Sequence, residues 1–133
     1  MEANVVSGAV VSSAIAVHTA LGPGLLESAY SSCLVHELRV RGIRVEVQVP
    51  LPIVYRGERI EAGYRLDLIA ERLVVVELKA VTKLLPIHEA QLLSYLRLSG
   101  HQVGLLLNFH VARMKDGIRR MVDSSIPSRR EAD

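Results

Sequence analysis

The chain has 133 residues, a length that suits one domain with a modest hydrophobic core. Half of the residues are hydrophobic, which excludes wholesale disorder, and the net charge of +2 is too small for a protein that coats nucleic acid. The single cysteine, Cys33, excludes an internal disulfide, and we expect it to be a small buried apolar residue.

The N-terminal segment predicts a helix over residues 4–20, because apolar residues recur there at helical spacing. No charged residue occurs between Ala3 and Leu26, which is long enough to raise the question of a membrane span. Its serines, the break at Gly22-Pro23-Gly24 and the acidic Glu2 in front argue against a span and against a signal peptide. We therefore expect a mostly buried helix in a cytoplasmic protein that does not bind membranes.

A second helix should follow this break, with Leu26, Tyr30, Leu34 and Leu38 as its buried stripe and Gly42 after its end. The apolar period then changes to two, which predicts strands, with Pro50 and Pro52 marking an edge or a bulge. The remaining predicted elements are strands over 43–49, 53–55, 59–70 and 73–79, a helix over 87–99, and strands over 103–109 and 114–122.

This order of elements predicts an α/β or α+β domain, in which a mixed sheet is flanked by helices and preceded by two of them. We expect one domain over residues 1–123. Residues 124–133 are polar and contain a proline, so they predict a flexible tail.

Three charged residues, Asp67, Glu77 and Lys79, lie in stretches that otherwise predict a buried β-hairpin. Burying such groups is costly unless something pairs with them, and a divalent metal ion together with a phosphate would do so. This segment therefore indicates phosphodiester chemistry.

The loop between the two strands decides whether the two acids meet. A three-residue loop over 71–73 places Asp67 directly opposite Glu77, with Cβ atoms roughly 5 Å apart. Two carboxylates that close repel unless a cation lies between them, and oxygen ligands suit Mg²⁺ or Mn²⁺. A two-residue loop sends them to opposite faces, and the turn sequence Ala-Glu-Arg-Leu does not decide.

In the first register, Asp67 and Glu77 hold a metal ion that polarises the phosphate and lowers the pKa of a bound water. Lys79 shares a face with Glu77 and either orients that water or stabilises charge on phosphorus. The alternative is a structural salt bridge between Glu77 and Lys79, because an acid-x-lysine triplet alone has low specificity.

Other candidate residues come from the helices. Gln91 and Tyr95 are four apart on the third helix, so they share a face and suit holding a phosphate or the lysine. His88 lies one turn earlier, where it either contacts substrate or is a solvated residue at the helix start. Glu27 lies in the first turn of the second helix, where the helix dipole alone also favours a carboxylate.

Gly24, Glu27 and Tyr30 form a G-x-x-E-x-x-Y pattern, and here the chain resembles the GxxExxY proteins of the PD-(D/E)XK nuclease superfamily. The resemblance covers residues 10–122. It continues through the blocks Gly63–Leu68, Val76–Ala80, Gln91–Leu96 and Val103–Phe109.

The resemblance implies a restriction-endonuclease-like core and a metal-dependent nuclease site. The residues that it assigns to this site are the metal ligands Asp67, Glu77 and the Leu78 carbonyl, the catalytic Lys79, the additional acid Glu27, and Gln91 with Tyr95 as a Q-x-x-x-Y pair.

The leading hypothesis is a Mg²⁺- or Mn²⁺-dependent nuclease that acts on DNA, with RNA as the alternative substrate. Two arginine sets could meet backbone phosphate, and solvated surface charge is the alternative for each. The sets are Arg39, Arg41 and Arg44, and Arg119, Arg120, Arg129 and Arg130.

The competing hypothesis is a non-catalytic nucleic-acid-binding or assembly module with the same fold, which the small size and weak net charge favour. In both cases we expect a homodimer formed through the apolar N-terminal helix. A small-molecule enzyme has little support, because no phosphate-binding glycine loop is present.

Overall fold

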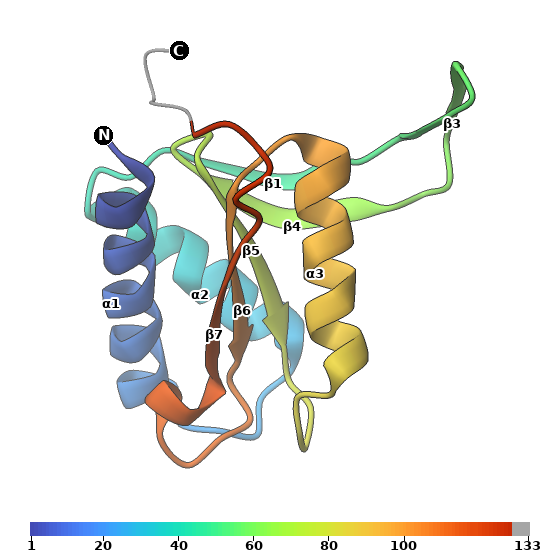
Figure 1. The fold of residues 1–133 in the computed structure, drawn as a ribbon. Coiled ribbons are helices and arrows are strands. Elements are labelled where there is room, and N and C mark those ends of the chain that lie inside the picture. Colours follow the sequence, from blue (N-terminus) through green and yellow to red (C-terminus); the bar gives the residue numbers. More distant parts are fainter. Residues whose placement is uncertain (129–133) are drawn as a thin grey trace.

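The computed structural model describes residues 1–128 (Figure 1). Its elements, in chain order, are α1 (Ala3–Leu21), α2 (Glu27–Val40), β1 (Val45–Pro50), β2 (Ile53–Tyr55), β3 (Glu58–Ile60), β4 (Arg65–Ala70), β5 (Val74–Lys79), α3 (Pro86–Ser99), β6 (Val103–Asn108), the 3₁₀ helix η1 (Met114–Gly117) and β7 (Ile118–Val122).

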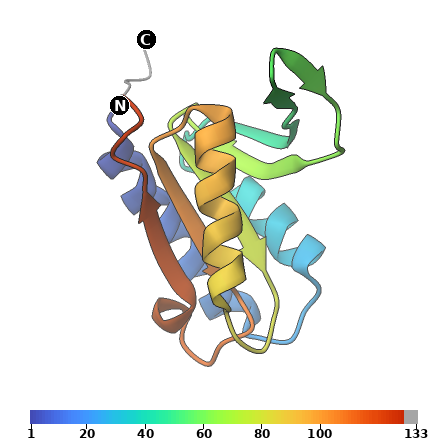
Figure 2. The ribbon, with the colours of Figure 1, turned by 45° about the vertical axis from the view of Figure 1, so that its right-hand side comes forward.

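Five strands form one mixed sheet in the order β1-β4-β5-β6-β7. The β5–β6 pair is parallel and the other three pairs are antiparallel. Helices α1 and α2 cover one face and α3 covers the other, as Figures 1 and 2 show. The predicted α+β class is confirmed, with a mixed sheet and two helices in front of it.

Two apolar clusters hold these layers together. On one face, Val6, Val10, Ala14 and Val17 of α1 are buried against the sheet together with a stripe of α2, whereas Leu21 at the end of α1 is exposed. The α2 residues are Tyr30, Leu34 and Leu38. On the other face, Leu92, Tyr95 and Leu96 of α3 pack on the sheet. β5 and β6 lie under both layers, which explains their continuous apolar runs.

Helix α1 is long and apolar enough to cross a membrane, with a mean hydropathy of 1.5, and 39% of this stretch is buried inside the protein. Core helices of soluble proteins have the same length and composition, so these properties are weak evidence for a span. The buried residues Val6, Val10, Ala14 and Val17 lie in the protein core, as expected of a core helix.

Two expectations for α2 were wrong. The side chain of Leu26 is 76% exposed, because α2 begins one residue later and Leu26 takes the N-cap position. Cys33 is exposed, since it lies outside the stripe of Tyr30, Leu34 and Leu38 that contacts the core.

The strand predicted over residues 59–70 is interrupted. β3 ends at Ile60 and β4 begins at Arg65, and between them Gly63 takes a φ of +79° that favours glycine. β2 and β3 form a separate two-stranded hairpin, which projects beyond the main sheet (Figure 2). The predicted strand over 114–122 also starts later, because its first four residues form η1.

The division into a domain over 1–123 and a flexible tail over 124–133 stays a prediction. Within the described part, the Ile126 carbonyl accepts a hydrogen bond from the side chain of Gln102 (3.0 Å). Arg129 and Arg130, named above as candidate phosphate contacts, lie outside the described residues.

Candidate active site

The β4–β5 turn has the three-residue loop that brings the two acids together. Leu68 pairs with Val76 and Ala70 with Val74, so one further step of this register sets Asp67 opposite Glu77. The two-residue alternative does not occur.

Arg44 anchors this turn to the start of β1. Its backbone and side-chain nitrogens both donate to the buried carboxylate of Glu71, at 3.0 and 2.8 Å. Glu71 and Arg72 take positive φ values of 52° and 57°, a conformation that residues other than glycine rarely adopt. The Arg44–Glu71 contact helps to hold the turn in this shape.

Each acid accepts a hydrogen bond from the backbone of the neighbouring strand. The Asp67 amide donates to Glu77 Oε1 (3.1 Å), and the Leu78 amide donates to Asp67 Oδ2 (2.8 Å). The side chains thus replace backbone pairing at this point, and both carboxyl groups are held between β4 and β5.

Glu77 is 5% exposed, and its environment disfavours the ionised form. Burial raises its pKa to about 9, and the neighbouring Asp67 carboxylate adds to the effect. Without a cation, this environment favours the protonated form of Glu77. A metal ion that displaced the proton would offset the repulsion that arises once both carboxyl groups are ionised.

The Leu78 carbonyl lies on the same edge of β5 as Asp67. A strand residue directs its N–H and C=O toward the same neighbour, and the Leu78 N–H donates to Asp67. The Lys79 carbonyl instead accepts from the Phe109 amide (3.0 Å), on the β6 side. The backbone therefore presents the Leu78 oxygen to the acid pair, which is where the resemblance places a ligand.

Lys79 lies at the end of β5, half-buried, and its Nζ donates to Gln91 Oε1 of α3 at 3.4 Å. Beyond it, the buried side chain of Asn108 accepts from the Val81 amide (3.0 Å) and donates to the Val81 carbonyl (2.9 Å). This contact continues the β5–β6 ladder past its last register pair, which joins Lys79 to Asn108.

Tyr95 follows Gln91 by one turn and borders the same site. Burial raises the pKa of its phenol, and the Glu77 carboxylate raises it further. Tyr64 lies beside it, with the ring centroids 6.0 Å apart. The sequence did not indicate a role for Tyr64. Its only signal there is that it is an aromatic residue three positions before Asp67.

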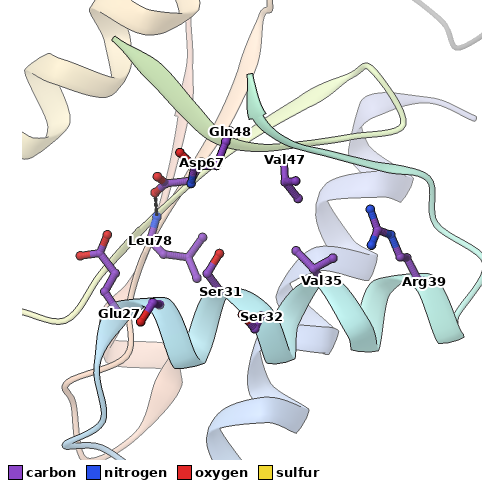
Figure 3. Close-up of a pocket in the computed structure, with 10 residues that line it drawn as sticks. Glu27, Ser31, Ser32, Val35, Arg39, Val47, Gln48, Asp67 and Leu78 are labelled. Atoms are coloured by element: carbon purple, nitrogen blue, oxygen red, sulfur yellow. Dashed lines mark hydrogen bonds between the residues drawn. The ribbon is translucent and has the colours of Figure 1, made fainter. Parts of the chain in front are cut away.

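Glu27, on α2, lines the same cleft as Asp67 and Leu78, as Figure 3 shows. Burial raises the pKa of this carboxyl, Asp67 raises it further, and Lys79 lowers it. Glu27 therefore lies within electrostatic reach of both residues. His88 accepts a hydrogen bond from the Leu85 amide (3.0 Å) and helps to cap α3.

The spacing of Gly24, Glu27 and Tyr30 has a structural explanation. Gly24 has a φ of +103°, which glycine adopts without strain. The Tyr30 hydroxyl donates to the Gly22 carbonyl and accepts from the Leu25 amide (3.1 Å), and the ring stacks on Phe109 at 4.6 Å. Tyr30 thus fixes the loop that delivers Glu27 to the site.

The sequence profile of the PD-(D/E)XK nuclease superfamily matches residues 4–121. The chain belongs to this superfamily. Its three helices and mixed five-stranded sheet are consistent with a restriction-endonuclease-like core. No curated protein and no solved structure matches the chain significantly.

PD-(D/E)XK nucleases usually use divalent metal ions, and the donor atoms here suit a hard cation. Asp67, Glu77 and the Leu78 carbonyl offer only oxygen, which Mg²⁺ and Mn²⁺ prefer. Within residues 1–128, no three His, Cys, Asp or Glu side chains are grouped as a metal site. A metal ion would therefore depend on the backbone oxygen and on water to complete its coordination.

Proposed function

We propose that the protein is a Mg²⁺- or Mn²⁺-dependent nuclease that hydrolyses phosphodiester bonds in DNA, with RNA as the alternative substrate. The observation that carries this proposal is the Asp67–Glu77 pair, held side by side between two strands with Lys79 two residues further along β5. Two acids held side by side in a buried site offer oxygen ligands for a divalent cation.

In this proposal Asp67, Glu77 and the Leu78 carbonyl hold the metal ion, with Glu27 as an additional acid. The ion, when bound, supplies Lewis acidity toward the phosphate and a more acidic water. Lys79 holds a positive charge beside the scissile phosphate and stabilises the negative charge that develops there. Gln91 orients Lys79 through its amide oxygen, and Tyr95 closes the site on the side of α3.

We further propose that the chain belongs to the GxxExxY group within the superfamily. The structural roles of Gly24 and Tyr30 support this assignment, because both residues shape the loop that positions Glu27.

The second candidate is a non-catalytic module that binds nucleic acid or assembles with other proteins. Its support is the small size of the chain and its weak net charge of +2. We also propose a homodimer formed through exposed apolar residues of α1, among them Val5 (62% exposed) and Ile15 (43%). The mass of the protein in solution, measured by light scattering, tests the homodimer, and a mass equal to one chain would exclude it. The cytoplasmic location stays a prediction.

A cleavage assay tests the nuclease directly. The purified protein is incubated with single-stranded DNA, duplex DNA and RNA, in Mg²⁺, in Mn²⁺ and in EDTA. Cleavage should require the metal and fall at least about 100-fold in Asp67→Asn and Lys79→Ala. Lys83→Ala is the matched control, because Lys83 is an exposed lysine in the following loop. Equal cleavage by all the variants would indicate a contaminant, and none by the wild-type protein would favour the second candidate.

A further inference from the structure

A cleft of about 700 Å³ lies between α2 and β1 and opens at the candidate site (Figure 3). Asp67, Leu78 and Glu27 line one end, and Arg39 lines the other. Because a helix rises 1.5 Å per residue, the backbones of Glu27 and Arg39 are about 18 Å apart. The cleft therefore extends well beyond the space that one scissile phosphate occupies.

The two ends of the cleft differ in charge. The carboxylates of Asp67 and Glu27 repel a phosphate in the absence of a cation, whereas Arg39 attracts one. Arg41 and Arg44 of the same set are engaged with Glu37 and Glu71 (2.6 and 2.8 Å). Within residues 1–128, no carboxylate lies within ion-pair distance of Arg39, which is exposed and donates to the Val45 carbonyl at 3.3 Å.

The α2 wall of the cleft carries serine hydroxyls that the fold does not use. In α1, Ser13 and Thr19 donate to carbonyls one turn earlier, both at 2.8 Å. The hydroxyls of the serines at the cleft make no hydrogen bond within the described part of the chain, so they remain available to a ligand. They are Ser28, Ser31 and Ser32. Val35 and Val47 supply an apolar wall between them and Arg39.

We propose that this cleft binds the sugar-phosphate backbone of the substrate strand on one side of the scissile bond. Arg39 pairs with a phosphate remote from the metal site, and the serine hydroxyls donate to the phosphates between. This inference rests on the proposed nuclease function and goes beyond it, because it selects Arg39 among the described arginines of the two sets as the phosphate contact. Arg120, on β7, bonds to Asn4, and Arg119 donates to the Ile118 carbonyl (3.1 Å).

The test measures binding separately from cleavage. Lys79→Ala serves as the parent, so that a fluorescein-labelled oligodeoxynucleotide stays intact in Mg²⁺ while its anisotropy is followed. Arg39→Gln should weaken binding about fivefold to tenfold and reduce the slope of log K against log salt by about 1. The matched control Arg119→Gln removes the same charge from β7 and should leave both quantities unchanged.

A second variant tests the cleft without changing its charge. Ser31→Leu adds bulk beside Asp67 and Leu78 and should weaken binding while the salt slope stays at the parent value. Circular dichroism and thermal unfolding establish that each variant is folded.

Parent-like binding by Arg39→Gln, or a larger loss in Arg119→Gln, would overturn this proposal and leave the nuclease intact. A wild-type protein that neither binds nor cleaves any nucleic acid would overturn both.

Discussion

The backbone amide of Asp67 donates a hydrogen bond to the carboxylate of Glu77 at 3.1 Å. Glu77 is opposite Asp67 in the extended register, so each acid is held by the strand that carries the other. This exchange explains how two carboxyl groups remain side by side in a buried setting. It also makes their protonation a property of the pair.

The metal-free protein should lose stability as pH rises. Folding raises the pKa of Glu77 from 4.5 to about 9, so the folded state binds this proton more tightly than the unfolded state. The stabilisation is complete below pH 4.5 and decreases up to pH 9, by at most about 1.4 kcal/mol per pH unit. Glu77→Gln imitates the protonated form, and urea unfolding in EDTA at pH 5, 7 and 9 should show a smaller loss for this variant.

The control for this experiment is Glu58→Gln, a change at an exposed position of the β2–β3 hairpin. Its pH dependence should match that of the wild type. If Glu77→Gln also matched the wild type, the raised pKa would not describe the folded protein.

Metal affinity should rise with pH, because the cation must displace the proton of Glu77. Below pH 9 each unit of pH should tighten Mg²⁺ or Mn²⁺ binding by up to about tenfold, and binding should release protons. Calorimetry in two buffers of different ionisation enthalpy measures this release. Affinity that is independent of pH would place the ion elsewhere.

Tyr30→Phe should show how much the hydrogen bonds of the Tyr30 hydroxyl contribute, apart from the stacking of its ring. The Gly22 carbonyl and the Leu25 amide would lose their partner, whereas stacking on Phe109 would remain. We expect a loss of about 1–2 kcal/mol in the free energy of unfolding and weaker metal-dependent activity, because the loop before Glu27 would loosen. Tyr55→Phe, at a side chain that is 62% exposed, is the matched control and should change neither.

Asn108→Ala should disturb the end of β5. It leaves the Val81 amide and carbonyl without their side-chain partner, which costs about 1–3 kcal/mol when such groups are buried. Lys79 pairs with Asn108 in register. The cleavage rate should therefore fall even under conditions in which the variant is still fully folded. An Asn108→Ala protein with normal stability and turnover would show that the ladder extension is dispensable.

The sequence predicted most elements of the fold, because the apolar periods of its helices and strands are regular. The register of the acid hairpin could not be predicted, since Glu71 and Arg72 adopt left-handed conformations for which their side chains give no signal. The break between β3 and β4 was missed for a related reason. An isolated Gly63 is compatible with a continuous strand, and the projection of the hairpin depends on the whole sheet.

Some residues of the candidate site could be predicted from the sequence and others could not. Asp67, Glu77 and Lys79 could be found because charges interrupt an apolar pattern. Tyr64 and Asn108 could not, since their roles depend on Tyr95 and Val81, which are distant in sequence. The geometry brings the predicted residues together, while their chemical roles stay predictions.

At the candidate site, the apolar side chains of β1 and β4 switch from one face of the sheet to the other. Val45 packs on the α1–α2 side and Val49 on the α3 side, with Gln48 between them at a φ of 49°. In β4, Leu68 and Leu66 divide in the same way around Asp67, and the Gln48–Asp67 rung is missing from the strand pairing. The sheet therefore has a bend at Gln48 and Asp67. A movement of one half of the sheet relative to the other would displace Asp67, so a ligand that binds to β1 would change the distance between the two acids.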